Sequence, residues 1–196
     1  MQHQNKRRSN ASRSKATREA LVAAARALFI DKGYAETSTP EIVKAADITR
    51  GALYHHFKDK EDLFRAVVRA EYEAVMTEIT TSAAREPSSA VDALMLGSRG
   101  YLNAMRKAGR VRLILLDAPA VLGRLELDSI DQETSAGALR NGLKSAMERG
   151  EIKSLPLGIL TVQLSAMFDR AALGIAGGDD PEEHLSIFEA IFSALK

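Results

Sequence analysis

The chain has 196 residues, a net charge of only +1 and no cysteine. A chain of this length can bury enough apolar surface to fold without disulfides or metals, and the lack of cysteine excludes disulfides, thiolate zinc sites and cysteine nucleophiles. The densest apolar run, residues 113–116, is far shorter than the roughly 18 residues of a membrane span. We therefore expect a soluble protein of a reducing cytoplasm, with no membrane partner.

The charge is unevenly distributed along the chain. Residues 1–60 carry twelve Lys and Arg against six Asp and Glu, whereas residues 61–196 carry fifteen against twenty. Six cations precede the first acidic residue, Glu19: Lys6, Arg7, Arg8, Arg13, Lys15 and Arg18. The basic end is therefore the candidate contact for a polyanion. We expect residues 1–13 to form a basic flexible tail, with an organelle transit peptide as the alternative interpretation.

Almost every segment has the apolar periodicity of a helix and none alternates as a strand does, which predicts an all-α protein. A first helix carries Leu21, Ala25, Leu28 and Phe29 on one face. It should end at Gly33, because glycine readily adopts the left-handed conformation that closes a helix.

Two short helices are expected next. Ser38 and Glu41 have the spacing of a capping box, and Pro40 suits a first turn, so the second helix should begin there. After a break at residues 47–48, Thr49 is placed to cap a third helix that runs to about Phe57. Two short helices joined by a tight turn, the second with cationic and hydrogen-bonding side chains, describe a helix-turn-helix, here over about residues 38–57.

A fourth, longer helix should start near Asp59 and continue to about residue 84. Residues 85–89, Arg-Glu-Pro-Ser-Ser, are the first clear interruption and the expected domain junction. We thus expect a three-helix DNA-binding domain with its linking helix over residues 14–84 and a helical ligand-binding and dimerisation domain over residues 85–196. Within the second domain, the pattern predicts helices near residues 89–107, 110–118, 125–149, 156–176 and 181–195.

The third helix has an outward and an inward side at about 100° per residue. Its outward side consists of Arg50, Gly51, Tyr54 and His55, and its inward side includes Leu53, His56 and Phe57. The adjacent pair His55 and His56 would diverge by about 100°, which argues against a metal site, and no other metal ligand set or catalytic residue is predicted.

We expect the outward side to enter the major groove of DNA, where base edges carry distinguishable donors and acceptors. Arg50 matches the acceptors of guanine, His55 can donate to a base or a phosphate, and Tyr54 to a phosphate. Gly51 and Ala52 keep the surface thin enough for close approach. Phosphate contacts are expected near helix N-termini, from Thr37, Thr39, Thr49 and Lys60, although the three threonines serve equally well as helix caps.

Residues 33–64, GYAETSTPEIVKAADITRGALYHHFKDKEDLF, resemble the DNA-binding segment of the tetracycline-repressor (TetR) family of bacterial transcription regulators. The resemblance implies operator contacts by Thr37, Thr49, Arg50, Gly51, Tyr54, His55 and Lys60. Asp47 departs from the family, which commonly has glycine in the turn. Since aspartate tolerates unusual backbone angles better than most residues, we expect the turn to survive.

The second half resembles the family only in layout, which implies that its last two long helices form a four-helix bundle with a second subunit. Apolar side chains at helical spacing form a seam that we assign to this dimer interface, with an intramolecular core as the alternative: Leu164, Phe168, Ala171, Leu185, Phe188, Phe192 and Leu195. We expect a ligand pocket among adaptable methionines and a few charges, with core and surface as the alternative: Met95, Arg99, Leu102, Met105, Leu116, Asp117, Met147, Met167 and Arg170.

The function predicted from these patterns is a homodimeric, ligand-responsive repressor that binds a palindromic DNA operator, needs no cofactor and responds to an unknown small-molecule effector. One alternative is a helical protein-binding adaptor that has lost operator binding. A helical enzyme is the other, but the chain has no glycine-rich phosphate loop and no Ser, His and acid arrangement that the helices would bring together.

Overall fold

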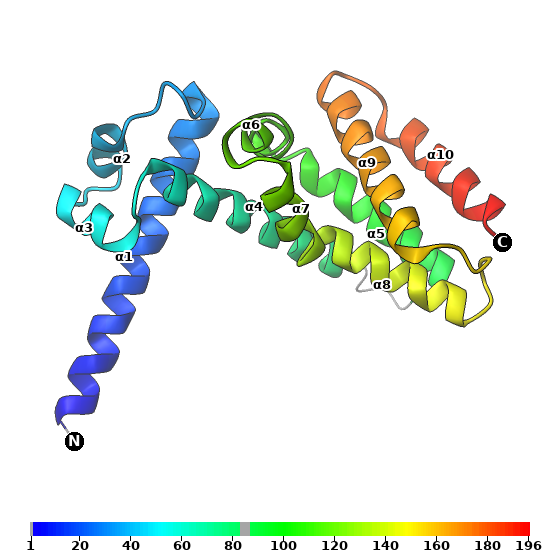
Figure 1. The fold of residues 1–196 in the computed structure, drawn as a ribbon, viewed down its shortest axis with the longest axis horizontal. Helices are drawn as coiled ribbons and strands as arrows, with labels where there is room; N and C mark the ends of the chain where they lie inside the picture. The colour runs from blue at the N-terminus through cyan, green and yellow to red at the C-terminus, as the bar shows by residue number, and fades with distance from the viewer. Residues whose placement is uncertain (1, 83–86) are drawn as a thin grey trace. The chain divides into compact units, whose positions relative to one another are not determined.

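The computed structural model describes residues 2–82 and 87–196, with side chains from residue 11 onward, and is shown in Figure 1. Within these residues the chain forms helices and loops and no strand, which confirms the all-α prediction. The chain divides into two compact units, Met1–Arg69 and Ala70–Lys196. The border lies inside the helix α4 (Lys60–Ser82), earlier than the junction expected at residues 85–89. Residues 85 and 86 of that junction lie outside the described residues.

The first unit contains α1 (Gln2–Lys32), α2 (Thr39–Ala45), α3 (Arg50–His56) and the start of α4. Its core includes Leu21, Ala25 and Phe29 of α1, all fully buried. The ring of Phe29 meets the ring of Phe64 edge-on at 5.1 Å. As expected, α1 closes at Gly33, which has a φ of 86° and donates its N–H to the Phe29 carbonyl.

The start of α1 differs from the expected flexible tail, because residues 2–13 belong to the helix. No glycine or proline occurs between residues 2 and 32, so nothing in the sequence interrupts the backbone hydrogen bonds of this helix. The side chains of residues 11–13 are exposed. The basic segment therefore extends α1, and only Met1 lies outside the described residues at this end.

The second unit contains the rest of α4 and α5 (Ala90–Met105), the π-helix η1 (Arg112–Asp117), α6 (Ala118–Leu122), α7 (Arg124–Gln132), α8 (Ser135–Glu148), α9 (Leu157–Ala176) and α10 (Pro181–Ala194). Helix α5 packs against α8, α9 and α10 (Figure 1). The core between them includes Leu102, Leu143 and the rings of Phe168 and Phe188, which stack with centroids 4.0 Å apart.

The single helix expected over residues 125–149 is wrong, because α7 and α8 are separated at residues 133–134. Asp131 accepts hydrogen bonds from the Ser135 hydroxyl and the Ala136 N–H, and the Thr134 hydroxyl donates to the Ile130 carbonyl. These side chains bind backbone and hydroxyl groups around the bend, which favours a local break over a continuous helix. Gly137 is required there, since a Cβ would lie 2.4 Å from the Gln132 carbonyl oxygen.

The helix expected over residues 110–118 also differs, because Arg112–Asp117 forms a π-helix that leads into α6. Pro119 lies in the first turn of α6 and has no N–H to donate to the carbonyl four residues before it. The widened turn thus occurs where the α-helical hydrogen-bond pattern lacks a donor.

A buried arginine joins α4 to the segment after α5. Arg110 is fully buried; its Nε donates to Glu71 at 2.8 Å, and its Nη1 donates to Glu78 at 2.9 Å and to the Ala104 carbonyl at 2.6 Å. The apolar periodicity did not predict this contact, because arginine is usually exposed. It is buried here because the fold places Glu71 and Glu78 beside it.

Helix α9 has the length and hydropathy of a membrane span, with a mean hydropathy of 1.3 over an 18-residue window that is 28% buried. Asp169 and Arg170 lie in the middle of the helix, and one face packs against α5, α8 and α10. A core helix can have the same length and composition, so these two properties alone are weak evidence for a membrane span.

Candidate functional site

The helix-turn-helix has the caps that the sequence predicts. At the start of α2, the Ser38 hydroxyl accepts from the Glu41 N–H, and the Glu41 carboxylate accepts from the Ser38 N–H at 3.0 Å. Lys32 also contacts this carboxylate, and hydrogen bonds from Lys32 and Ser38 lower the pKa of Glu41 to about 2. At the start of α3, the Thr49 hydroxyl accepts from the Ala52 N–H at 3.2 Å. Both short helices therefore have an N-cap from the side chain of the residue that precedes them.

The turn between α2 and α3 passes through Asp47, which has a φ of 53° and is the only residue other than glycine with positive φ among those described. The Ile48 N–H donates back to the Val43 carbonyl at 3.0 Å. Asp47 thus adopts the left-handed conformation, and the turn is formed as expected.

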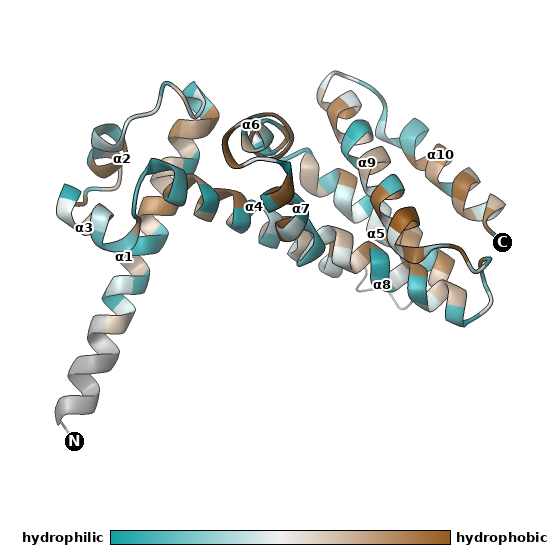
Figure 2. Cartoon of the chain, viewed as in Figure 1, coloured by the Kyte–Doolittle hydropathy of each residue, from teal (hydrophilic) through white to brown (hydrophobic). Residues whose placement is uncertain are grey.

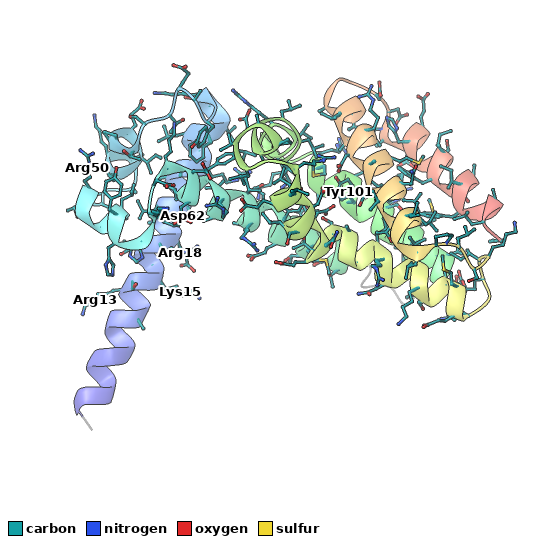
Figure 3. All side chains as sticks on the ribbon, viewed as in Figure 1. Arg13, Lys15, Arg18, Arg50, Asp62 and Tyr101 are labelled. Carbon is teal, nitrogen blue, oxygen red and sulfur yellow. The ribbon has the colours of Figure 1, made fainter. Side chains whose placement is uncertain are left out.

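The two sides of α3 agree with the predicted division. Leu53 is fully buried and Phe57, just after the helix, is 2% exposed. On the other side Arg50, Gly51, Tyr54 and His55 are exposed, and Figure 3 shows Arg50 projecting from this part of the first unit. A Cβ on Gly51 would meet nothing within 4 Å. The outward side is open to a large partner.

Tyr54 connects the two short helices at this surface. A hydrogen bond with Thr39 and a second with Arg50 lower the pKa of the Tyr54 phenol. The Arg50 guanidinium lies over the Tyr54 ring at 5.6 Å. The surface thus groups a hydroxyl from the start of α2 with a phenol and a guanidinium from α3, all of which can donate hydrogen bonds to a polyanion.

The neighbouring histidines differ in their environment. His55 is exposed, whereas His56 is half-buried, with its ring 6.5 Å from the ring of Phe57. The guanidinium of Arg18 covers the same Phe57 ring at 5.1 Å. In residues 11–82 and 87–196, no three side chains that bind metals gather into one group.

Two predicted phosphate contacts instead have internal partners. Thr37 is 1% exposed, and its hydroxyl donates to the Gly33 carbonyl at 2.8 Å. Lys60 donates from Nζ to the carbonyls of Tyr34 and Thr37, at 2.9 and 3.0 Å, and lies over the Tyr34 ring. We correct Thr37 to a structural residue, because a buried hydroxyl cannot reach DNA. Lys60 fixes the loop before α2 and has one remaining N–H.

The second unit contains a cavity of about 270 Å³ whose lining is mostly apolar. None of the nine predicted pocket residues lines it. Leu102, Met105 and Leu116 instead line a separate hollow of about 480 Å³ near η1. Arg99 pairs with Glu182, and Asp117 with Arg112. The predicted residues do not border the 270 Å³ cavity, because helical spacing gives the residues on a face but not which face borders empty space; the position of the ligand pocket stays a prediction.

Three polar side chains meet at the edge of the 270 Å³ cavity. The Tyr101 hydroxyl donates to Asp169 Oδ1 at 2.7 Å, and Asp131 lines the cavity beside Asp169. Burial raises the pKa of Asp169 to about 6 despite the Tyr101 hydrogen bond, and burial also raises the pKa of Asp131. Tyr101 lies inside the second unit (Figure 3). Sequence reasoning missed all three, since they are far apart along the chain.

The seam predicted as a dimer interface is instead core within the chain. Of its seven residues, six are at most 6% exposed and Leu195 packs against them. The exposed apolar side chains of α9 and α10 lie on other positions: Ile159, Val162, Met167 and Ile187, between 38% and 66% exposed. Figure 2 shows hydrophobic segments on both helices. The alternative interpretation of the seam was correct, because these residues fill the space between α5, α9 and α10.

Known proteins share both the sequence and the fold. Residues 21–67 match the profile of bacterial regulatory proteins of the tetR family, and residues 91–195, more than half of the chain, match that of the tetracyclin repressor-like C-terminal domain. The transposon Tn10 TetC protein of Escherichia coli is 26% identical over 186 residues, 93% of each chain. The HTH-type transcriptional repressor BepR of Brucella suis is 41% identical over 70 residues, 35% of this chain and 32% of that one.

Among solved structures, a tetR-family transcriptional regulator from Pectobacterium atrosepticum is 28% identical with a TM-score of 0.69, over 94% of each chain. The profile matches cover both the helix-turn-helix and the second unit, and this structure extends the agreement over almost the full length. The exposed face of α3 and the helical domain that follows it are thus those of a DNA-binding transcriptional regulator, and the chain belongs to the tetR family of bacterial regulatory proteins.

Proposed function

We propose that this regulator is a cytoplasmic homodimeric repressor that binds a roughly palindromic operator and is released from it by a small molecule. The observation that carries the DNA-binding part is the exposed face of α3, where Arg50, Gly51, Tyr54 and His55 lie opposite the buried Leu53. A helix with one anchored side and one thin polar side fits the major groove.

The side chains on this face divide into base and phosphate contacts. Arg50 has a planar fork that matches two acceptors on a guanine edge, and we assign it to base recognition. Tyr54, Thr39 and Thr49 lie at or beside helix N-termini, where phosphate oxygens are well bound. Gly51 has open space above it and allows the backbone to approach the groove, while His55 donates to a base or a phosphate.

Dimerisation would use the exposed apolar side chains of α9 and α10, with Ile159, Val162 and Ile187 more than half exposed. Water-exposed apolar side chains of this size favour association with a matching surface. A two-fold dimer presents two copies of α3 to successive major grooves, which are about 34–36 Å apart. The operator would then consist of two half-sites with the same symmetry.

Ligand control would act through α4, which contributes to both units. Its residues Met76, Ile79 and Thr80 line the 270 Å³ cavity, and its first residue, Lys60, fixes the loop before α2. A ligand that favours another position of α4 would lower the population able to bind DNA. A coupling of about 1–3 kcal/mol would weaken operator binding about 5- to 150-fold.

The test begins with selection of operator sequences from a random DNA library, followed by binding measurements over a salt series. Arg50→Ala should weaken binding to the selected operator by about 1–3 kcal/mol and relax selectivity at one base position. Lys144→Ala is the matched control, since Lys144 is an exposed cation on α8 that pairs with Glu148, and it should bind as the wild type does.

Two outcomes would contradict the assignment. Equal weakening of all DNA sequences by Arg50→Ala would make Arg50 a phosphate contact. Failure of the library selection, with no salt-sensitive and sequence-selective binding, would remove the operator from the proposal and favour the protein-binding adaptor.

A further inference from the structure

We propose that the 270 Å³ cavity of the second unit binds a small organic cation, with an aromatic or alicyclic body among the apolar side chains and a protonated amine at Asp169. This inference rests on the proposed ligand response for its regulatory meaning. Binding of the cation can be measured without DNA, so the two proposals can fail separately.

The cavity provides two distinct environments. Its wall is largely formed by apolar side chains of α4, α5 and α8 and by Phe168 of α9, including Ile79, Leu94 and Leu139. At one side, Asp169 and Asp131 bring two carboxylates to the lining. Small-molecule sites commonly combine an apolar wall with a few placed polar groups that fix the ligand's orientation. A ligand that fits this arrangement has an apolar body and one polar end.

Neither carboxylate has a cation of its own. Asp169 accepts the Tyr101 hydroxyl, and Asp131 accepts the Ser135 hydroxyl and the Ala136 N–H. In the part of the chain that the structure describes, neither aspartate forms an ion pair with lysine, arginine or histidine. Buried charges in proteins are normally paired, so the cavity lacks a positive charge that a ligand can supply.

The charged and titratable groups around Asp169 do not fill this role. They are Tyr101 of α5, Tyr72 of α4, Arg124, Asp128 and Asp131 of α7, and Arg140 of α8, which lines the polar cavity that Asp169 also borders. Arg124 and Arg140 are the cations of this set, but among the described residues neither forms an ion pair with Asp169 or Asp131. The Arg124 side chain is 66% exposed and lies 3.7 Å from Asp128. Its positive charge is therefore largely balanced by Asp128 and by solvent. Asp169 is therefore left with the Tyr101 hydroxyl as its hydrogen-bond partner, and a ligand cation can still pair with its carboxylate.

Both aspartates also line a second, more polar cavity of about 390 Å³, together with Ser165, Arg124 and Arg140. A ligand amine can therefore reach the carboxylates while the apolar body occupies the first cavity. An anion would face two carboxylates, and a neutral ligand would leave the Asp169 charge buried and unpaired. The order of affinity should be amine, then alcohol, then carboxylate for ligands of the same shape.

The experiment uses the full-length protein and matched probes that share one ring system: naphthylmethylamine, naphthalenemethanol and naphthoate, with the corresponding benzyl and biphenyl sets. Calorimetric titration at neutral pH should give tightest binding for the amine in at least one set. The inference is overturned if no amine binds at millimolar concentration, or if the alcohol or the carboxylate binds as tightly as the amine.

Asp169→Asn then tests the residue. The amide oxygen can still accept from Tyr101, so folding should be preserved, while amine binding should weaken about tenfold or more and alcohol binding should change little. Glu148→Gln is the matched control, because it removes an acid on the solvent side of α8 that pairs with Lys144. Unchanged amine affinity in Asp169→Asn would contradict the inference.

A measurement on the wild type gives an independent check. Because the pKa of Asp169 is about 6, amine affinity should fall as the pH is lowered from about 8 to about 5, while the amine stays protonated. The alcohol should bind equally over this range. A flat profile for the amine would contradict the role of Asp169. Amine binding without DNA binding would overturn the proposed function alone, and DNA binding without amine binding would overturn this inference alone.

Discussion

Two residues of this protein adopt states that are unfavourable for their residue type, Asp47 in the turn between α2 and α3 and Asp169 at the 270 Å³ cavity. Asp47 adopts a left-handed backbone conformation that favours glycine, and Asp169 keeps a carboxylate in an apolar cavity. Each departure has a cost in folding free energy that comes from a named physical cause, backbone strain in the first case and desolvation in the second.

The strain at Asp47 should be measurable by substitution. Asp47→Gly is expected to raise the free energy of unfolding by about 0.5–1 kcal/mol, because relief of the left-handed strain exceeds the added chain entropy of glycine. Asp47→Ala should lower it, since alanine tolerates positive φ less well than aspartate. Urea unfolding of the three proteins gives the comparison. Equal stability of all three would show that the φ of 53° stores no strain.

The burial of Asp169 predicts a pH-dependent stability. Its folded pKa of about 6 lies above the ordinary value of 3.8, so the folded state holds its proton more strongly than the unfolded state does. Stability from this group is present below about pH 4 and is lost as the pH rises through about 6, by about 2–3 kcal/mol in total. Asp169→Asn should remove this loss and be more stable than the wild type at neutral pH. Unfolding curves at several pH values test the prediction, which fails if the two proteins lose equal stability across this window.

Among the helices, hydrogen bonds between residues close in sequence determine where each helix begins and ends, whereas packing determines which of its faces is buried. The caps at Ser38 and Thr49 involve residues three positions apart, so their sequence is sufficient to predict them. The break between α7 and α8 depends on side chains that compete with the backbone for hydrogen bonds. A continuous apolar periodicity conceals such a break, which explains why one helix was expected there.

Arg110 connects two elements that periodicity treats separately, α4 and the segment before η1. Arg110→Ala is expected to lower the free energy of unfolding by about 3–5 kcal/mol, because the buried Glu71 loses its guanidinium partner. Glu78→Gln should cost much less, since the Glu78 side chain is 44% exposed and its charge is screened by water. Thermal and denaturant unfolding of both variants test this. A loss below about 1 kcal/mol for Arg110→Ala would show that the contact is not a main support of α4.

For the whole molecule, the proposed dimer depends on an apolar surface outside the core of one chain. The helices α9 and α10 bury one set of apolar residues and expose another, Ile159, Val162 and Ile187 among them. A single copy of the chain leaves this second set in water. We therefore place the proposed dimer interface on these residues instead of the seam expected from the sequence.

Val162→Glu and Ile187→Glu should shift the protein toward monomer in sedimentation measurements, because a charge would be buried in an apolar interface. The same two variants should bind the operator more weakly, because a monomer no longer holds two copies of α3 together. Leu125→Glu is the matched control, because Leu125 is 88% exposed on α7, outside this surface. Unchanged association of both interface variants, or an equal effect of the control, would contradict the placement.

Neighbouring residues were sufficient to predict the all-α class, the caps at Ser38 and Thr49, the helix-turn-helix and the two sides of α3. These features depend on the apolar periodicity of a single helix and on hydrogen bonds between residues a few positions apart in the sequence. Packing in three dimensions was needed to show that Thr37 is buried, that the seam from Leu164 to Leu195 is core, and that Tyr101, Asp131 and Asp169 meet at one cavity. The physical reason is that burial and cavities depend on which helix faces pack together, and a helical pattern gives the faces of each helix but not their partners.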